Sequence, residues 1–234
     1  MSFPEDDEPP FESPFNAIPP LVLAIALAAA AVEVWLSAGA LGLTGGATAI
    51  GWRSEAITDY AFSPLVWDQI AVRGNTSLDM VQRLVSYAFV HGSFTQALFG
   101  VALLLALGKF VGEVVHPLSL ALLLLIPTVA GAVVFGIVFD GPMALIGLFT
   151  PVYGLIGAFT YLLWLRLGQM GENRLNAFRL IGVLMIFQLA FALLFGASPV
   201  WVSEVAGFVT GFAASVLLAP GGWTAFLNRM RARS

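Results

Sequence analysis

Long apolar runs separated by short polar segments dominate the chain. Six of these runs are each close to the roughly 20 residues that an α-helix needs to cross a bilayer. The expected spans cover residues 20–43, 87–107, 118–139, 151–167, 180–197 and 200–218. The pattern therefore predicts an all-α integral membrane protein, a bundle of six transmembrane helices, whose third span bends at Pro127.

One polar region is much longer than the others and occupies residues 44–85. Apolar and charged positions alternate within it, which is typical of short amphipathic segments that lie in the membrane interface. Trp52, Tyr60 and Trp67 are residue types that favour the same interface. We expect this region to be a long outer loop.

The two ends of the chain differ from the middle in composition. Residues 1–17 are rich in proline and acidic side chains, which predicts a disordered tail because such a segment cannot bury enough apolar surface to fold. Residues 223–234 are basic and form the expected C-terminal tail. A single six-span membrane domain, residues 18–222, is expected between them.

Composition supports a membrane protein and narrows its chemistry. Of the 234 residues, 59% are hydrophobic and only 10% are charged, against about 45–50% and about 25% in soluble domains. The chain has no cysteine, which excludes disulfides and thiol catalysis. Two histidines, His91 and His116, are too few for a histidine-based metal site, so we expect no metal and no cofactor. The net charge of −4 implies no nucleic-acid partner.

Basic residues set the expected orientation, because cytoplasmic loops carry an excess of Lys and Arg. If both termini are inside, the inner segments hold Lys109, Arg166, Arg174, Arg179, Arg229, Arg231 and Arg233. The outer segments then hold Arg53, Arg73 and Arg83. We therefore expect both termini in the cytoplasm and residues 44–85 outside, with a bacterial inner membrane as the location.

Glu33 is a carboxylate inside the first expected span, where an unpaired charge is costly. We expect it to be neutralised by a partner or to lie near the boundary of the span. A functional role for Glu33 is the alternative that the sequence leaves open.

Three separated stretches carry glycine and polar residues at fixed spacings. These residues are Gly147, Tyr153 and Gly157 in the first stretch, Arg83, His91 and Ser93 in the second, and Gly207 and Gly211 in the third. Glycines within apolar segments allow neighbouring helices to approach closely, so the third stretch is expected to pack on the first. Together the three stretches resemble the motifs of rhomboid intramembrane serine proteases.

The resemblance implies a six-span rhomboid-like bundle and marks the positions where the family has its catalytic groups. The position of the nucleophilic serine is Phe149, and that of the histidine general base is Glu204. The family's second histidine and its asparagine, which help to stabilise the oxyanion, are replaced by Gln96 and Gly100. Since nucleophile and base act as a unit, these changes predict a member without catalytic residues.

The residues next to Phe149 bear on the same question. Pro151 is expected to begin the fourth helix, because proline is tolerated in the first turn. Phe149 would then lie in the preceding turn, with its ring filling the vacated volume. Thr150 carries the adjacent hydroxyl, but on a helix it points about 100° away from Phe149. His91 and Arg83 match family positions and are expected to be structural.

The favoured function is a rhomboid-like pseudoprotease that binds or stabilises other transmembrane proteins. A role as a subunit of a membrane complex is a variant of this function. Its expected partners are the lipid bilayer and other transmembrane proteins, and the oligomeric state stays open. The alternative is an active rhomboid-type protease with a displaced nucleophile such as Thr150 or Ser93. A transporter or channel is a third class, but the broken helices with facing polar groups expected of one are not evident.

Overall fold

The computed structural model describes residues 18–195 and 198–220. This part of the chain consists of helices joined by loops, with an isolated β-bridge between Phe62 and Leu145. The expected tails, 1–17 and 223–234, and the last two residues of the fifth expected span lie outside the described residues.

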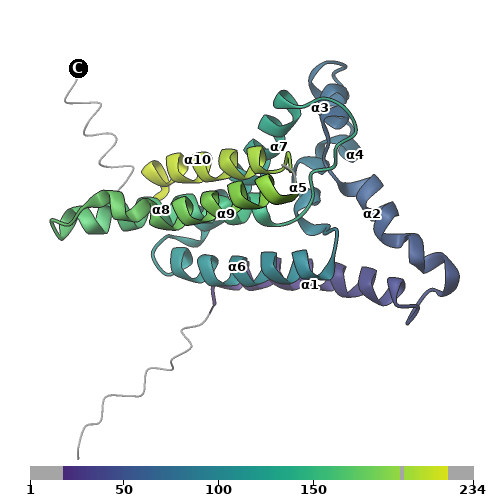
Figure 1. Ribbon diagram of the computed structural model, residues 1–234, viewed down its shortest axis with the longest axis horizontal. Coiled ribbons are helices and arrows are strands. Elements are labelled where there is room, and N and C mark those ends of the chain that lie inside the picture. The colour runs from purple at the N-terminus through teal and green to yellow at the C-terminus, as the bar shows by residue number, and fades with distance from the viewer. Residues whose placement is uncertain (1–17, 196–197, 221–234) are drawn as a thin grey trace, which may run out of the picture.

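The long helices follow the apolar runs of the sequence. They are α1 (Pro20–Ala40), α6 (Phe94–Gly112), α7 (Pro117–Val138), α8 (Phe149–Gln169), α9 (Arg179–Phe195) and α10 (Trp201–Leu218). Figure 1 shows α1 and α6 side by side along one edge of the bundle, with α8 and α10 side by side above them. Pro127 lies inside α7, as the sequence predicts, although the bend itself stays a prediction.

Four of the described helices are long and apolar enough to cross a membrane, namely α1, α6, α7 and α10. The other two long helices, α8 and α9, do not meet both requirements of length and hydropathy. The all-helical fold class is therefore confirmed, whereas the count of six spans stays a prediction.

Two of the expected helix boundaries are wrong. The second span was expected to begin at Tyr87, but residues 87–89 form the 3₁₀ helix η2 (Tyr87–Phe89), and α6 begins only at Phe94. The reason is local: Ser93 is an N-cap whose hydroxyl accepts a hydrogen bond from the Gln96 N–H at 3.2 Å. The fourth helix begins at Phe149 rather than Pro151, because proline is tolerated anywhere in a first turn whose N–H groups lack helical partners.

The long polar region folds into short helices that project from one side of the bundle (Figure 1). They are η1 (Gly46–Gly51), α2 (Trp52–Tyr60), α3 (Pro64–Ala71), α4 (Leu78–Val81) and α5 (Arg83–Ser86). The backbones of Phe62 and Leu145 exchange two hydrogen bonds, at 3.2 and 2.8 Å, which fasten this loop to the segment before α8. The loop is therefore attached to the bundle at a point next to the glycine-containing stretch that begins at Gly147.

Glu33 in α1 has a partner, as the sequence led us to expect. The Arg53 guanidinium of α2 donates to both carboxylate oxygens, at 2.9 and 2.7 Å, and the Ser37 hydroxyl donates to one of them at 2.7 Å. Arg53 also donates to the backbone carbonyl of His91 at 2.6 Å. This ion pair therefore ties α1, the outer loop and the segment before α6 together.

Helix α8 occupies the core, in contact with α6, α7 and α10. Its contact with α10 is made by backbone, since a Cβ on Gly211 would meet the backbone of Gly154, and a Cβ on Gly157 would meet that of Phe208. Small residues at both faces allow this approach. The predicted close packing of these two glycine-containing segments is thus confirmed.

Candidate functional site at the start of helix α8

A glycine turn sets the start of α8. Gly147 has a φ of +95°, a conformation that side chains disfavour, and its N–H donates to the Tyr87 carbonyl at 2.9 Å. Leu148 follows as the N-cap and is buried, and Phe149 is the first helical residue with a half-buried side chain. The turn therefore fixes where Phe149 enters the helix and ties it to the segment before α6.

Gln96 and Gly100 of α6 lie against this turn. A Cβ on Gly147 would lie 2.8 Å from the Gln96 Nε2 atom, and a Cβ on Gly100 would lie 3.1 Å from the Leu148 Cβ. The Gln96 Oε1 atom accepts from the Gly92 N–H at 2.8 Å, and its Nε2 donates to the Ile146 carbonyl at 3.5 Å. The amide of Gln96 is thus engaged in holding the loops on either side of it.

His91 is fully buried beside the same turn. A Cβ on Gly100 would lie 3.7 Å from its Nε2 atom, and one on Gly147 would lie 3.4 Å from its Cδ2 atom. Neither ring nitrogen has a hydrogen-bond partner in the described part of the chain. Burial lowers the pKa of the His91 imidazole, although the nearby Glu33 carboxylate opposes this shift. The ring is therefore neutral at neutral pH, and the backbone carbonyl of His91 makes the contact with Arg53.

Two hydroxyls face each other between α8 and α10. The Oγ1 atom of Thr150 lies 3.1 Å from the Oγ atom of Ser203, and both side chains are buried. The Ser203 hydroxyl also lies 2.7 Å from the Val200 carbonyl, to which it donates, so both hydroxyls have partners within the protein. Ser203 was not singled out from the sequence, where its position next to Glu204 was the available signal.

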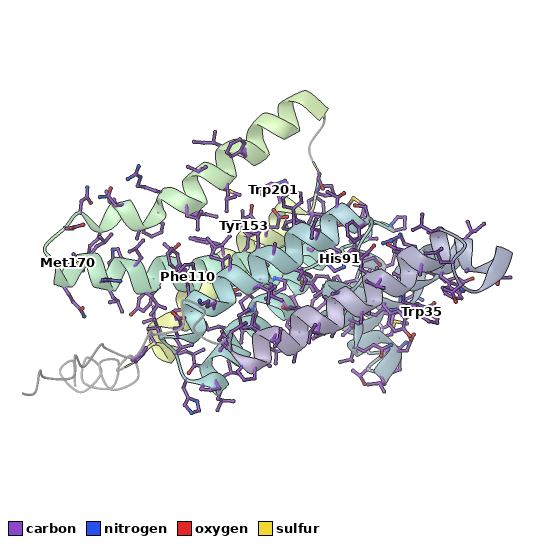
Figure 2. The ribbon with its side chains drawn as sticks, turned by 90° about the horizontal axis from the view of Figure 1, so that it is seen from below. Trp35, His91, Phe110, Tyr153, Met170 and Trp201 are labelled. Carbon is purple, nitrogen blue, oxygen red and sulfur yellow. The ribbon has the colours of Figure 1, made fainter. Side chains whose placement is uncertain are left out.

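Glu204 lies one turn into α10 and is 7% exposed. Tyr153 of α8 is buried as well, at 5% exposure. The helix that carries Glu204, α10, packs on α8, which carries Tyr153. Helix α9, by contrast, rises away from α8 beyond the turn at Met170 (Figure 2).

The remaining positions that the sequence marked have packing or anchoring surroundings. Gly157, Gly207 and Gly211 all lie where α8 and α10 touch, and a Cβ on Gly207 would lie 2.5 Å from the Thr150 carbonyl oxygen. Arg83 lies in the outer loop, where it donates to the Thr58 carbonyl at 2.7 Å and to the Asp79 carbonyl at 3.3 Å. It takes no part in the cluster at the start of α8.

Tyr87 was assigned to a membrane span from the sequence and was not treated as part of the site. It is fully buried, its carbonyl accepts from Gly147, and its hydroxyl donates to the Thr128 carbonyl at 2.9 Å. No sequence spacing signals this role, because it depends on α7 lying next to η2. Among the described residues no group of His, Cys, Asp and Glu could hold a metal ion.

Comparison with known proteins adds one positive result. No curated protein matches the chain. The family model of the Rhomboid domain matches residues 78–221, which include α6 to α10 and every position that the sequence marked as a family-motif position. This match covers more than half of the sequence. The apolar helices of the protein imply contact with a lipid bilayer. The chain belongs to the rhomboid family of membrane proteins.

Proposed function

We propose that this chain is a rhomboid-like pseudoprotease that binds or stabilises other transmembrane proteins. The observation that carries the proposal is the pair of residues at the positions of nucleophile and base, Phe149 and Glu204. A phenyl ring has neither a nucleophilic atom nor a proton to transfer. Nucleophile and base work as a unit, so the loss of both leaves no acyl-transfer chemistry at these positions.

The groups near Phe149 support the same conclusion. The Thr150 hydroxyl is buried between α8 and α10 and is paired with Ser203, whose own proton goes to a backbone carbonyl. Gly100 has no side chain to stabilise an oxyanion, and the Gln96 amide is bonded to the loops beside it. As a displaced nucleophile, Thr150 would first have to give up its hydrogen bond with Ser203 in the interface between α8 and α10.

The proposed activity is the binding of a hydrophobic helix. Helix α9 diverges from α8 (Figure 2), and α6 presents the exposed aromatic side chains Phe94, Phe99 and Phe110 to the membrane. Van der Waals packing between such surfaces is what associates helices in a bilayer. The rest of the proposal follows from the sequence: α8 and α9 also cross the membrane, both termini are cytoplasmic, and the location is a bacterial inner membrane.

Proteolysis is tested with the purified chain in phospholipid vesicles, using a model transmembrane substrate and an active rhomboid protease as the positive control. We expect no cleavage above the protein-free background. Cleavage by the wild-type chain that disappears in Thr150→Ala or in Ser93→Ala would establish the displaced-nucleophile protease instead and overturn the proposal.

Helix binding is tested separately, with a photoreactive amino acid placed at Phe99 of α6 and, as a control, at Trp35 of α1. Both side chains are exposed, at 58% each. We expect crosslinks to a co-reconstituted transmembrane helix at Phe99 in excess of those at Trp35. Equal crosslinking at both positions would mean random collisions in the membrane and would contradict a specific binding face.

A further inference from the structure

An apolar cavity of about 140 Å³ lies between α1, α6, α7 and α8. Its lining includes Leu21 and Ile25 of α1, Leu104 of α6 and Leu125 and Thr128 of α7, together with Ala88 and Phe89 of η2. Phe149, Glu204, Gln96 and Gly100 do not line it. The cavity therefore does not include these positions, but it adjoins them, since Leu148 and Pro151 line it.

The walls offer no place for water. Thr128 is the polar side chain among the described residues that line the cavity, and its hydroxyl already donates to the Leu124 carbonyl at 2.7 Å. The Thr128 carbonyl accepts from the Tyr87 hydroxyl at 2.9 Å, so it too is engaged. A buried water needs two to four polar partners, and cavities without them stay dry. The natural occupant is therefore apolar.

The lining of the cavity reaches the outer surface of the bundle. Helix α1 packs on α6, whereas α7 packs on α8 and α10, so the walls formed by α1 and α7 belong to different parts of the bundle. Leu125, which lines the cavity, is 46% exposed on the outside of α7. In a protein embedded in a membrane, an apolar opening of this kind meets lipid acyl chains before anything else.

The volume decides between a lipid and a protein occupant. A helix with its side chains is about 10–12 Å across and does not fit into such a space. An apolar cavity of about 150 Å³ in another protein holds one molecule of benzene, so this one has room for a short stretch of hydrocarbon chain. We propose that the cavity is a binding site for one acyl chain of a membrane phospholipid.

Contacts with four helices distinguish this site from the general lipid boundary. A chain in the cavity touches α1, α6, α7 and α8 at once, whereas a chain on the outer surface touches one or two helices. Filling the space also adds van der Waals contacts to the side chains that line it. The bound chain would bridge α1 and α7, and it would leave with difficulty during delipidation.

The site is tested in vesicles containing a phospholipid with a diazirine near the middle of one acyl chain. After irradiation, peptide mass spectrometry locates the label on the full-length protein. We expect more label at Ile25 and Leu125 than at Phe110, which is exposed on α6 but does not line the cavity. Labelling of Ile25 and Leu125 no stronger than that of Phe110 would overturn the proposal.

Matched substitutions sharpen the test. Ala121 lines the cavity, and Ala121→Phe fills it, whereas Ala106 is exposed on the face of α6 opposite Leu104, where Ala106→Phe changes only the outer surface. We expect the label at Ile25 to be lost in Ala121→Phe and kept in Ala106→Phe. Unchanged labelling in Ala121→Phe would mean that the acyl chain is not in the cavity.

A second variant guards against misfolding of Ala121→Phe. Ile25→Ser leaves the cavity open and places a hydroxyl in its wall, which makes it less favourable for hydrocarbon. We expect the label at Leu125 to fall, with retained thermal unfolding as the check on folding. Undiminished label at Leu125 in a folded Ile25→Ser protein would also contradict the site.

Discussion

The ion pair between Glu33 and Arg53 allows a quantitative prediction about how the outer loop is held to the bundle. Glu33→Gln keeps the size of the side chain and removes its charge. The Arg53 guanidinium then stays in a site where its side chain is only 19% exposed, facing a group that no longer balances it. Breaking a buried pair by removing one partner costs about 3–5 kcal/mol, and the partial exposure of Arg53 places this pair near about 3 kcal/mol.

A double variant of Glu33 and Arg53 separates the attraction between the two charges from the cost of removing them from water. Glu33→Leu and Arg53→Met each leave one charge without its partner, whereas the two changes together remove both charges. We expect the double variant to lose less stability than either single one, because an apolar pair of similar volume replaces a desolvated ion pair at little cost. The His91 carbonyl also loses its donor in every Arg53 variant, which costs about 1 kcal/mol.

The assay is the free energy of unfolding in detergent micelles, followed by tryptophan fluorescence. Trp35 and Trp52 stack with ring centroids 5.0 Å apart, so the surroundings of these two rings change when α1 and α2 separate. Asp79→Asn is the matched control, because the Arg83–Asp79 pair has a 3.8 Å separation and a 59% exposed carboxylate, and such pairs contribute about 1 kcal/mol or less. If Glu33→Gln lost no more stability than Asp79→Asn, the reasoning about burial would be refuted.

Three further predictions concern packing, hydrogen bonding and topology. Gly211→Ala should lower the free energy of unfolding by about 1–3 kcal/mol because its Cβ would meet the α8 backbone. Gly182→Ala is the control, since open space surrounds Gly182 and the change should not destabilise the protein. If thermal unfolding showed Gly182→Ala to be the less stable variant, the packing of α8 on α10 would be contradicted. Tyr87→Phe should cost about 1 kcal/mol in the same assay, since it removes the hydrogen bond from the Tyr87 hydroxyl to the Thr128 carbonyl of α7, and no measurable loss would argue against that bond. The chain has no cysteine, so the variants Ser54→Cys and Glu113→Cys each carry one thiol. A membrane-impermeant maleimide added to intact cells should label Ser54→Cys and not Glu113→Cys. Labelling of Glu113→Cys alone would mean that the orientation is opposite to the proposed one.

Particular residues show where sequence reasoning succeeded and where it stopped. The apolar run predicted at 118–139 became α7 with nearly the same bounds, since an uninterrupted run of helix-length apolar residues has few alternatives. The run predicted at 87–107 was placed too early, because hydropathy does not register that Val90 is extended and that Ser93 caps the helix. Glu33 called for a partner, but the partner lies 20 residues away in a polar loop whose path hydropathy cannot trace.

Apolar run length, together with the motif spacings, determined that the chain is an all-helical rhomboid-family protein, because helix formation in a membrane depends on composition over about 20 residues. The identities of Phe149 and Glu204 were likewise readable from the sequence. Only the tertiary structure decided that Thr150 pairs with Ser203, that Arg53 balances Glu33, and that α1 and α7 enclose an apolar cavity. Those features depend on which distant side chains meet when helices pack, and one-dimensional spacing carries no record of such contacts.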